Sequence, residues 1–191
     1  MGIKENRPDH LKVRVMDDIH CLDNFYSGVQ TMDDFIHGGF GDSVRNHYCQ
    51  AYVASSGDEI VAMFALSFDS LDLDSDDKEE LVSGASSAAT PQINFDYEDT
   101  FWAKPRYPAL DIAYLAVSEK FRGHHIGRTL IEQIAERARQ QTFVGCQFLT
   151  VEAYCTQEYS AVGFYAKCGF AASEIKKPYK DTQRMFKTLY S

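Results

Sequence analysis

The sequence predicts a mixed α/β fold, because strand patterns and helix patterns alternate along the chain. Two apolar, partly β-branched runs, Tyr48–Ala54 and Glu59–Phe68, flank a Ser-Ser-Gly-Asp turn and predict an antiparallel hairpin. The most apolar run, Leu110–Val117, has the length of a central strand that is buried on both faces. With 191 residues the chain is long enough for one full-sized core, so we expect a single domain over residues 1–191.

The elements before the hairpin are expected to be short. Leu11–Val15 alternates apolar and polar residues, the period of a half-buried edge strand. Helical stretches are expected around Ile19–Tyr26 and Thr31–Gly39. In the second stretch Thr31 is a suitable N-cap, and the glycine pair at its end is a suitable stop.

Acidic residues are concentrated between the hairpin and the central strand. The segment from Asp69 to Asp99 contains ten acids and one base, which accounts for the whole net charge of −9. Large apolar residues are rare in it until Phe95. We therefore expect residues 69–104 to form an exposed acidic insertion of low hydrophobicity, with a short helical turn near Asp76–Val82.

After the central strand the pattern is strongly periodic. A helix is predicted from Ile126 to Gln141, because its apolar residues fall on one stripe at a spacing of 3.6. A buried strand is predicted at Phe148–Ala153, a helix at Glu158–Lys167 and a last strand at Gln183–Leu189. The second helix is expected to stop at Gly169, since glycine commonly ends a helix.

Composition excludes several classes of protein. With 45% apolar, 25% charged and 13% aromatic residues, the chain is expected to fold as a soluble globule. No apolar run approaches the roughly 20 residues of a membrane span, and the first residues contain no apolar signal region, so we expect a cytoplasmic protein without membrane contact. An acidic chain is poorly suited to binding duplex nucleic acid without sequence specificity. The five cysteines show no Cys-x-x-Cys spacing, and no metal site is expected.

One junction points to a ligand. After the apolar strand, a short loop that contains Arg122 and Gly123 leads into the predicted helix, near Arg128. The amides of such a loop, the free N–H groups of the first helical turn and the helix dipole together favour an anion. The structural alternative is a tight turn in which glycine serves geometry alone. Neither a P-loop nor the glycine pattern of a dinucleotide-binding fold is present.

Two segments resemble a known family. Leu115-Ala116-Val117 followed by Arg122-Gly123-His124-His125-Ile126-Gly127 resembles the acetyl-CoA motif of the GNAT superfamily of N-acyltransferases, Gln/Arg-x-x-Gly-x-Gly/Ala. Arg122 and Gly127 match, and His125 stands at the middle glycine. Residues 161–170 resemble the late helix of the family and its ending, Ala-x-x-Phe-Tyr-x-x-x-Gly-Phe.

The resemblance implies a fold and a reaction. The fold would be a mostly antiparallel twisted sheet flanked by helices, with a V-shaped splay between its two central strands. Acetyl-CoA would be the co-substrate, attacked directly in a ternary complex by a primary amine of a small molecule or peptide. A homodimer is a candidate assembly, because members of the family often form dimers. The residues implied in binding acetyl-CoA are Leu115, Ala116, Val117, Arg122, Gly123, His124, His125, Ile126, Gly127 and Arg128.

The resemblance also implies catalytic roles. Tyr165 matches the tyrosine that stabilises or protonates the thiolate leaving group, and its alternative role is to pack on the sheet. The amine must lose a proton before it can attack. Asp111 on the central strand and Glu152 on the facing strand are both candidate bases, and the alternative for Asp111 is a salt bridge.

Two other functions remain open. The segments Phe25–Val29, Asp33–Phe35 and Arg106–Pro108 resemble the toxin-type branch of the superfamily, whose members acetylate the amino group of aminoacyl-tRNA. Charged tRNA is therefore the one nucleic acid that we expect as a candidate partner. The second alternative is a non-catalytic acyl-CoA-binding module, which is suggested by His125 at the position of the middle glycine.

Overall fold

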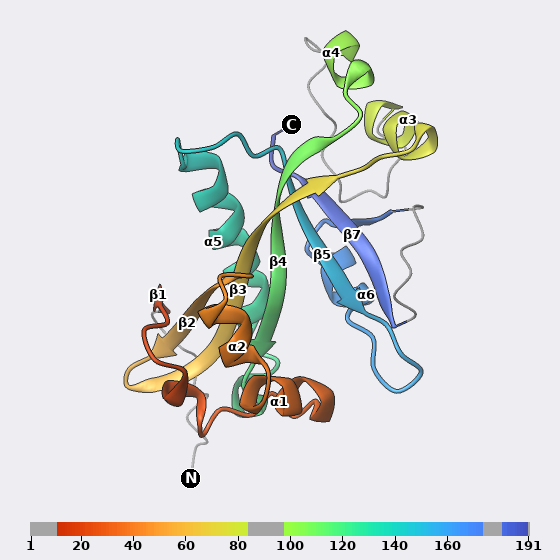
Figure 1. Cartoon of the computed structure of the whole chain (residues 1–191). Coiled ribbons are helices and arrows are strands. Elements are labelled where there is room, and N and C mark those ends of the chain that lie inside the picture. Colours follow the sequence, from red (N-terminus) through yellow and green to blue (C-terminus); the bar gives the residue numbers. More distant parts are fainter. Residues whose placement is uncertain (1–10, 84–97, 174–180, 191) are drawn as a thin grey trace. The chain divides into compact units, whose positions relative to one another are not determined.

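The computed structural model describes residues 11–83, 98–173 and 181–190 (Figure 1). In these residues the strands form a seven-stranded sheet in the order β1-β2-β3-β4-β5-β7-β6. The central strands β4 and β5 pair in parallel, whereas β1–β2, β2–β3, β5–β7 and β6–β7 pair antiparallel. The expected mixed α/β fold with a mostly antiparallel sheet is confirmed. The strands are β1 Lys12–Val15, β2 Gln50–Ser56, β3 Glu59–Leu71, β4 Tyr107–Val117, β5 Phe148–Tyr154, β6 Ala171–Ala172 and β7 Thr182–Thr188.

The chain divides into two compact units. Unit 1 comprises Met1–Ser67 and Ala113–Leu130, and unit 2 comprises Phe68–Ile112 and Ile131–Ser191. Three elements, β3, β4 and the helix α5 (Ile126–Gln140), contribute residues to both units. The β4–β5 ladder lies in unit 2 and pairs Ala109–Asp111 with Phe148–Thr150. The V-shaped splay beyond these pairs stays a prediction.

Unit 1 is built on the β2–β3 hairpin and its short helices. These are η1 Ile19–Leu22, α1 Gln30–His37, α2 Phe40–Arg45 and η3 Glu119–Phe121. Leu22, Phe25, Ile36 and Phe40 pack with hairpin residues such as Met63 in one core. The helix α2 was not expected from the sequence, because six residues are too few to show a helical period.

The start of α1 differs from the expectation. The helix begins at Gln30, and the residue at its N-cap is Val29 rather than Thr31. Asp33, inside the helix, accepts hydrogen bonds from Ser27 N at 2.7 Å and Gly28 N at 3.0 Å. This carboxylate therefore holds the preceding turn in place of a side-chain cap.

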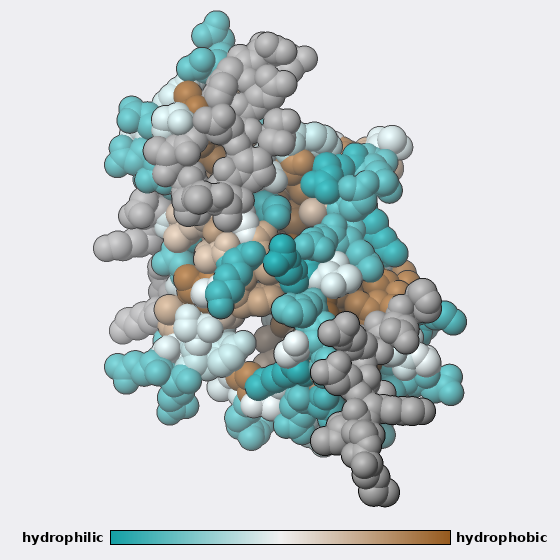
Figure 2. Space-filling model, turned by 180° about the vertical axis from the view of Figure 1, so that it is seen from behind, coloured by the Kyte–Doolittle hydropathy of each residue, from teal (hydrophilic) through white to brown (hydrophobic). Residues whose placement is uncertain are grey.

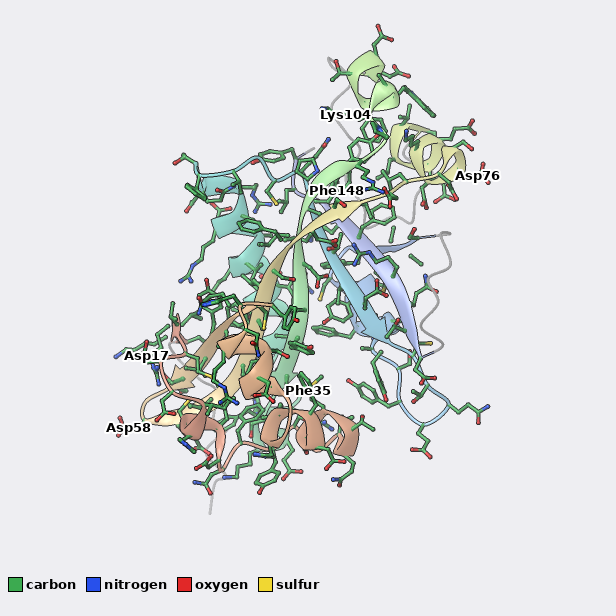
Figure 3. The ribbon with its side chains drawn as sticks, in the orientation of Figure 1. Asp17, Phe35, Asp58, Asp76, Lys104 and Phe148 are labelled. Atoms are coloured by element: carbon green, nitrogen blue, oxygen red, sulfur yellow. The ribbon has the colours of Figure 1, made fainter. Side chains whose placement is uncertain are left out.

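The acidic segment is more structured and more buried than expected. Its described residues form α3 Ser75–Ser83 and α4 Glu98–Ala103, while residues 84–97 lie outside the described part. Lys78 connects the two helices by donating hydrogen bonds to the carbonyls of Trp102 (3.4 Å) and Lys104 (3.1 Å). Asp76 is exposed on α3 and points away from the sheet (Figure 3). Four apolar residues of the segment, Leu71, Leu73, Leu81 and Phe101, join a core in unit 2, which also contains Tyr107, Phe148 and Phe186.

The late helices follow the prediction in part. The helix α5 spans Ile126–Gln140, and Leu130, Ile131, Ile134, Ala135 and Ala138 are all buried as expected. The helix α6 spans only Val162–Lys167, so the expected start at Glu158 is wrong. The residues before it form a turn instead, because Cys155 bridges to Ser160 and Thr156 bonds with the backbone of Tyr159.

The structure also bears on membrane contact. No helix in the described part of the chain is long and apolar enough to cross a bilayer. Among the residues that Figure 2 colours by hydropathy, polar ones predominate and apolar ones form separate patches on the face shown.

Substitution of Leu81 tests whether α3 belongs to the core of unit 2. Leu81 is 1% exposed, so Leu81→Ala should lower the free energy of unfolding by about 2–4 kcal/mol through lost burial and a residual cavity. Urea unfolding would measure this. Glu80→Ala, at the exposed neighbouring position, is the matched control and should change the value by no more than about 0.5 kcal/mol. Equal effects of the two substitutions would mean that the segment is the solvated insertion that the sequence suggests.

Candidate functional site

The candidate binding residues lie in unit 1, whereas the candidate catalytic residues lie in unit 2. In unit 1, β4 ends at Val117 and α5 begins at Ile126. Between them Gly123 has a φ of +82° and His125 a φ of +59°. Histidine is one of the few side chains enriched in this left-handed region. His125 therefore adopts a backbone conformation that is usually left to glycine.

The loop has the features of an anion site. An added Cβ at Gly123 would meet no atom within 4 Å, so the backbone there borders open space. Ile126 and Gly127 are buried at the start of α5, whereas His125 and Arg128 are exposed and His124 is half-buried. Because α5 has fifteen residues, its first turn contributes N–H groups and the positive end of a full helix dipole.

The loop is held by the segment that precedes α1. The guanidinium of Arg122 donates a hydrogen bond to the carbonyl of Ser27. Glu119 N donates to Tyr26 O at 3.0 Å, and Ser27 is in turn held by Asp33. The side chain of Arg122 thus anchors the loop, and the backbone of the loop remains the part that can face an anion.

The other residues of the acetyl-CoA motif are on β4. Leu115 and Val117 are half-buried, and Ala116 is 5% exposed in the core of unit 1. Ser118 N donates to Val61 O at 2.9 Å, which ties the end of β4 to the hairpin. Ala116 therefore exposes little of its side chain, whereas the side chains of Leu115 and Val117 are partly exposed.

In unit 2 a buried arginine gathers three carboxylates. Arg184 on β7 is 6% exposed. Its guanidinium pairs with Asp69, near the end of β3, and its Nη1 lies 3.2 Å from Glu152 Oε1 and 3.6 Å from Asp111 Oδ1. The β5–β7 register places Glu152 directly opposite Arg184, and Thr182 Oγ1 donates to Glu152 Oε2 at 3.1 Å. Both sequence-derived candidate bases therefore belong to one charge cluster.

Thr150 connects two of the carboxylates. It is fully buried and opposite Asp111 in the β4–β5 register. Its Oγ1 lies 2.6 Å from Asp69 Oδ2 and 3.2 Å from Asp111 Oδ1. The cluster thus joins residues of β3, β4, β5 and β7.

The pKa values of Asp111 and Asp69 are shifted in opposite directions. Burial, with the nearby charge of Asp69 as a smaller cause, raises the pKa of Asp111 from 3.8 to about 6, although Arg184 opposes the rise. Burial also acts on Asp69, but hydrogen bonds from Thr150 and Arg184 outweigh it and lower the pKa of that carboxyl. Asp111 is therefore a carboxyl that can take and release a proton near neutral pH.

Tyr165 lies on α6 in the same unit. Its ring packs against Phe164 and Phe170, and the side chain is 6% exposed. Burial is the main cause that raises its pKa, and the charge of Asp111 adds to the rise. None of the described residues forms a hydrogen bond with its hydroxyl, which is unusual for a buried phenol. The structure thus brings Tyr165 and Asp111 within electrostatic reach of each other.

Asp69, Thr150 and Arg184 are the members of the cluster that the sequence analysis missed. Asp69 was indistinguishable from the other acids of its segment. Arg184 and the buried Phe186 lie on the same face of β7, since residues two apart in a strand share a face. A charged residue within this apolar pattern is the sequence feature that could have indicated a buried arginine. Among the described residues no group of three or more His, Cys, Asp or Glu side chains is placed to hold a metal ion.

Comparison with known proteins gives one family and a set of similar folds. The model of the acetyltransferase (GNAT) family matches residues 15–170. No curated protein sequence matches the chain. A crystal structure of a KacT mutant has a TM-score of 0.66 at 14% identity and covers 95% of this chain and 96% of its own. AtaTR bound with acetyl-CoA has a TM-score of 0.64 at 19% identity, with 95% of each chain covered. AtaT complexed with acetyl-methionyl-tRNAfMet has a TM-score of 0.62 at 16% identity, with 92% and 94% covered.

The pKa of Asp111 predicts a pH-dependent stability. In the unfolded chain this carboxyl loses its proton near pH 3.8, whereas in the folded protein it keeps the proton until about pH 6. Its contribution to stability is therefore complete below about pH 4 and is lost as the pH rises to 6, with an upper bound of about 3 kcal/mol. Asp69 acts in the opposite sense and below this window.

Urea unfolding between pH 4 and pH 7 would measure the effect. Asp111→Asn should remove this part of the pH dependence, because the amide does not titrate. Asp72→Asn is the matched control, since Asp72 is an exposed acid that pairs with Arg106 outside the cluster. The interpretation fails if Asp111→Asn retains the wild-type slope in this window.

Proposed function

The chain belongs to the acetyltransferase (GNAT) family, and we propose that it is an N-acetyltransferase that moves an acetyl group from acetyl-CoA to a primary amine. The observation that carries the proposal is Asp111, a buried carboxyl whose pKa of about 6 suits a base that works near neutral pH. The amine attacks the thioester directly, with both substrates bound, and no acyl-enzyme is required. Acceptors are small-molecule or peptidyl amines.

Asp111 is the better of the two candidate bases. An amine arrives mainly as an ammonium and must lose a proton to have a lone pair for attack. Both carboxylate oxygens of Glu152 accept hydrogen bonds, from Arg184 and from Thr182. Asp111 is 3.6 Å from Arg184, beyond hydrogen-bond distance, so its oxygens are less committed to the cation. We assign proton abstraction to Asp111 and a supporting role to Glu152.

Tyr165 is the proposed acid for the leaving thiolate. Its raised pKa keeps the phenol protonated at neutral pH, so a proton is present when the thiolate forms. Because a thiol with a pKa near 8.5 is a stronger acid than a phenol, the hydroxyl stabilises the leaving thiolate by donating a hydrogen bond, and it passes on its proton as it receives another from the acylated nitrogen. A buried hydroxyl without a described partner supports this role, since most buried polar groups are hydrogen-bonded.

The loop before α5 fits the pyrophosphate of acetyl-CoA. Open space at Gly123 allows close approach to the backbone, and the left-handed conformation of His125 supports the loop without a glycine at that position. The amides from Arg122 to Arg128 would hold the phosphates, and the backbone of Leu115 and Val117 would align the pantetheine arm. The site residues in this role are the ten that the sequence motif contains.

Acetylation of aminoacyl-tRNA is the second candidate function. The amino group of an aminoacyl-tRNA is itself a primary amine, so the same base and acid would serve. The complex of AtaT with acetyl-methionyl-tRNAfMet, whose fold covers 92% of this chain, favours this acceptor. The net charge of −9 weighs against a large polyanionic acceptor.

A thiol-release assay with acetyl-CoA separates these functions. The panel should contain polyamines, amino acids, aminoglycosides, peptides and charged tRNA. Turnover with a small amine or peptide supports the main proposal, and turnover with charged tRNA alone supports the second. Calorimetric binding of CoA without turnover on any acceptor would instead make the chain a non-catalytic acyl-CoA-binding module.

Tyr165→Phe tests the acid. The variant removes only the hydroxyl and keeps the ring that packs on Phe164 and Phe170. We expect kcat to fall by about 100-fold, with an unchanged KM for acetyl-CoA, because proton donation is a transition-state effect. Steady-state kinetics would measure both constants. Tyr159→Phe, at a half-exposed position near α6, is the control, and full activity of Tyr165→Phe would remove the assigned role.

Gly123→Ala tests the binding loop. A Cβ at positive φ costs about 1–2 kcal/mol, so the loop should leave its conformation and the KM for acetyl-CoA should rise about tenfold. Gly57→Ala is the control, because Gly57 also has positive φ and open surroundings but lies in the β2–β3 turn. Both variants should lose similar stability. A similar rise of KM in both would contradict the assignment of the loop.

A further inference from the structure

The charge cluster in unit 2 contains a residue that the proposed reaction does not yet use. We propose that Asp69 is a positioning residue of the acetyl-transfer site, which acts through Thr150 and Arg184 to make Asp111 the carboxyl that holds the proton. The inference rests on the proposed function and deepens it. The carboxylate that accepts the proton can be identified by titration, without turnover.

Thr150 has a single hydroxyl proton to donate. Thr150 Oγ1 lies within hydrogen-bond distance of Asp69 (2.6 Å) and of Asp111 (3.2 Å), but it can donate to only one of them. The shorter contact marks Asp69 as the acceptor. A lone pair of Thr150 Oγ1 is then left for Asp111, which can use it only when Asp111 carries a proton. The hydroxyl therefore favours the protonated form of Asp111.

The guanidinium of Arg184 does not bond equally to the three carboxyls. Nη2 of Arg184 bonds to Asp69, and Nη1 bonds to Glu152 at 3.2 Å. Asp111 lies 3.6 Å from Nη1 and receives no hydrogen bond from it. Charge-assisted hydrogen bonds are about twice as strong as neutral ones. Arg184 thus stabilises the ionised forms of Asp69 and Glu152 more than that of Asp111.

The charged groups around Asp111 affect its ionisation. The groups facing it are Asp69 from β3, Thr150 and Glu152 from β5, Arg184 from β7 and Tyr165 from α6. With both other carboxyls ionised and Arg184 positive, these groups sum to −1. Ionisation of Asp111 would bring a second uncompensated negative charge into a buried place, which is unfavourable. Asp111 therefore holds a proton more readily than Asp69.

These contacts give the reaction a defined proton path. Asp111 takes one proton from the acceptor ammonium, so an N–H bond breaks and an O–H bond forms on Asp111. The resulting amine forms a C–N bond at the thioester carbon as the C–S bond breaks. The leaving thiolate takes the phenolic proton of Tyr165, and the phenolate takes the second proton from the acylated nitrogen. The new O–H donates to Thr150 Oγ1, whose own proton stays directed at Asp69. After product leaves, Asp111 releases the proton to solvent, and the cluster returns to its starting charge.

The inference predicts the effect of Asp69→Asn. The substitution removes one negative charge, and its neutral amide oxygen is a weaker acceptor than the carboxylate for the hydrogen bonds from Thr150 and from Arg184 Nη2. Both donors therefore become more available to Asp111. All three changes favour ionised Asp111. We expect the acidic limb of the kcat/KM profile to move down by at least about one pH unit, and the plateau to fall several-fold because a weaker base accepts the proton.

Carbon-13 NMR titration of the Asp111 carboxyl in the full chain provides the decisive readout. The titration midpoint should fall in Asp69→Asn and stay at the wild-type value in Asp72→Asn, which removes the same charge three residues away and outside the cluster. An unchanged midpoint in Asp69→Asn overturns the inference. If the midpoint falls but no acceptor is acetylated, the role of Asp69 in the cluster stands and the proposed function fails.

Thr150→Val separates positioning from charge, because it changes no formal charge. Under the inference, protonated Asp111 loses its hydrogen-bond acceptor, so its titration midpoint falls. If the hydroxyl instead donates to Asp111, the midpoint rises, and that result overturns the inference. The dispersion of the NMR spectrum reports in the same sample whether each variant is folded.

Discussion

The buried charge of Arg184 is the constraint on which unit 2 depends. A guanidinium that leaves water must be paired, and removal of one partner from a buried pair typically costs about 3–5 kcal/mol. The partners come from three strands, so the end of β3, the first half of β4 and β5 must keep their positions relative to β7. Burial and these contacts together set the acid–base behaviour, because they raise the pKa of Asp111 to about 6 and lower the pKa of Asp69. In this unit stability and candidate chemistry therefore have a common cause.

In unit 1 the corresponding constraint is a loop that must present its backbone. The loop before α5 can do so only if other contacts hold its side chains and its neighbours. Arg122 bonds to the carbonyl of Ser27, and Asp33 holds the backbone N–H of Ser27 and of Gly28. Gly28 leaves no room for a side chain, because an added Cβ would lie 2.9 Å from the carboxylate of Glu119. The segment before α1 thus holds the candidate binding loop through a contact between residues 95 positions apart in the chain.

Most elements could be predicted from the sequence, because their periods are local properties. The hairpin, β4, β5 and α5 follow from alternation, apolar length and a helical stripe, and the glycine loop follows from its place between two of them. What could not be predicted depends on pairing across the sheet. Glu152 meets Arg184, and Thr150 meets Asp111, only through strand register, which no local pattern specifies. Likewise α6 starts late because Cys155 and Ser160 bridge, a contact that overrides helix propensity.

The acidic segment shows why a charge count along a chain is a poor guide to electrostatics. Its acids are close in sequence, but the fold places them in different environments. Asp69, near the end of β3, pairs with Arg184, and Asp72 pairs with Arg106 at the surface. Asp77 is buried and accepts a hydrogen bond from Ser173, whereas Asp76 is exposed to solvent. Exposed charges are screened by water and salt, whereas a buried charge changes the pKa of its neighbours. Among the described acids of the segment, Asp69 is therefore the one that pairs with Arg184 beside Asp111.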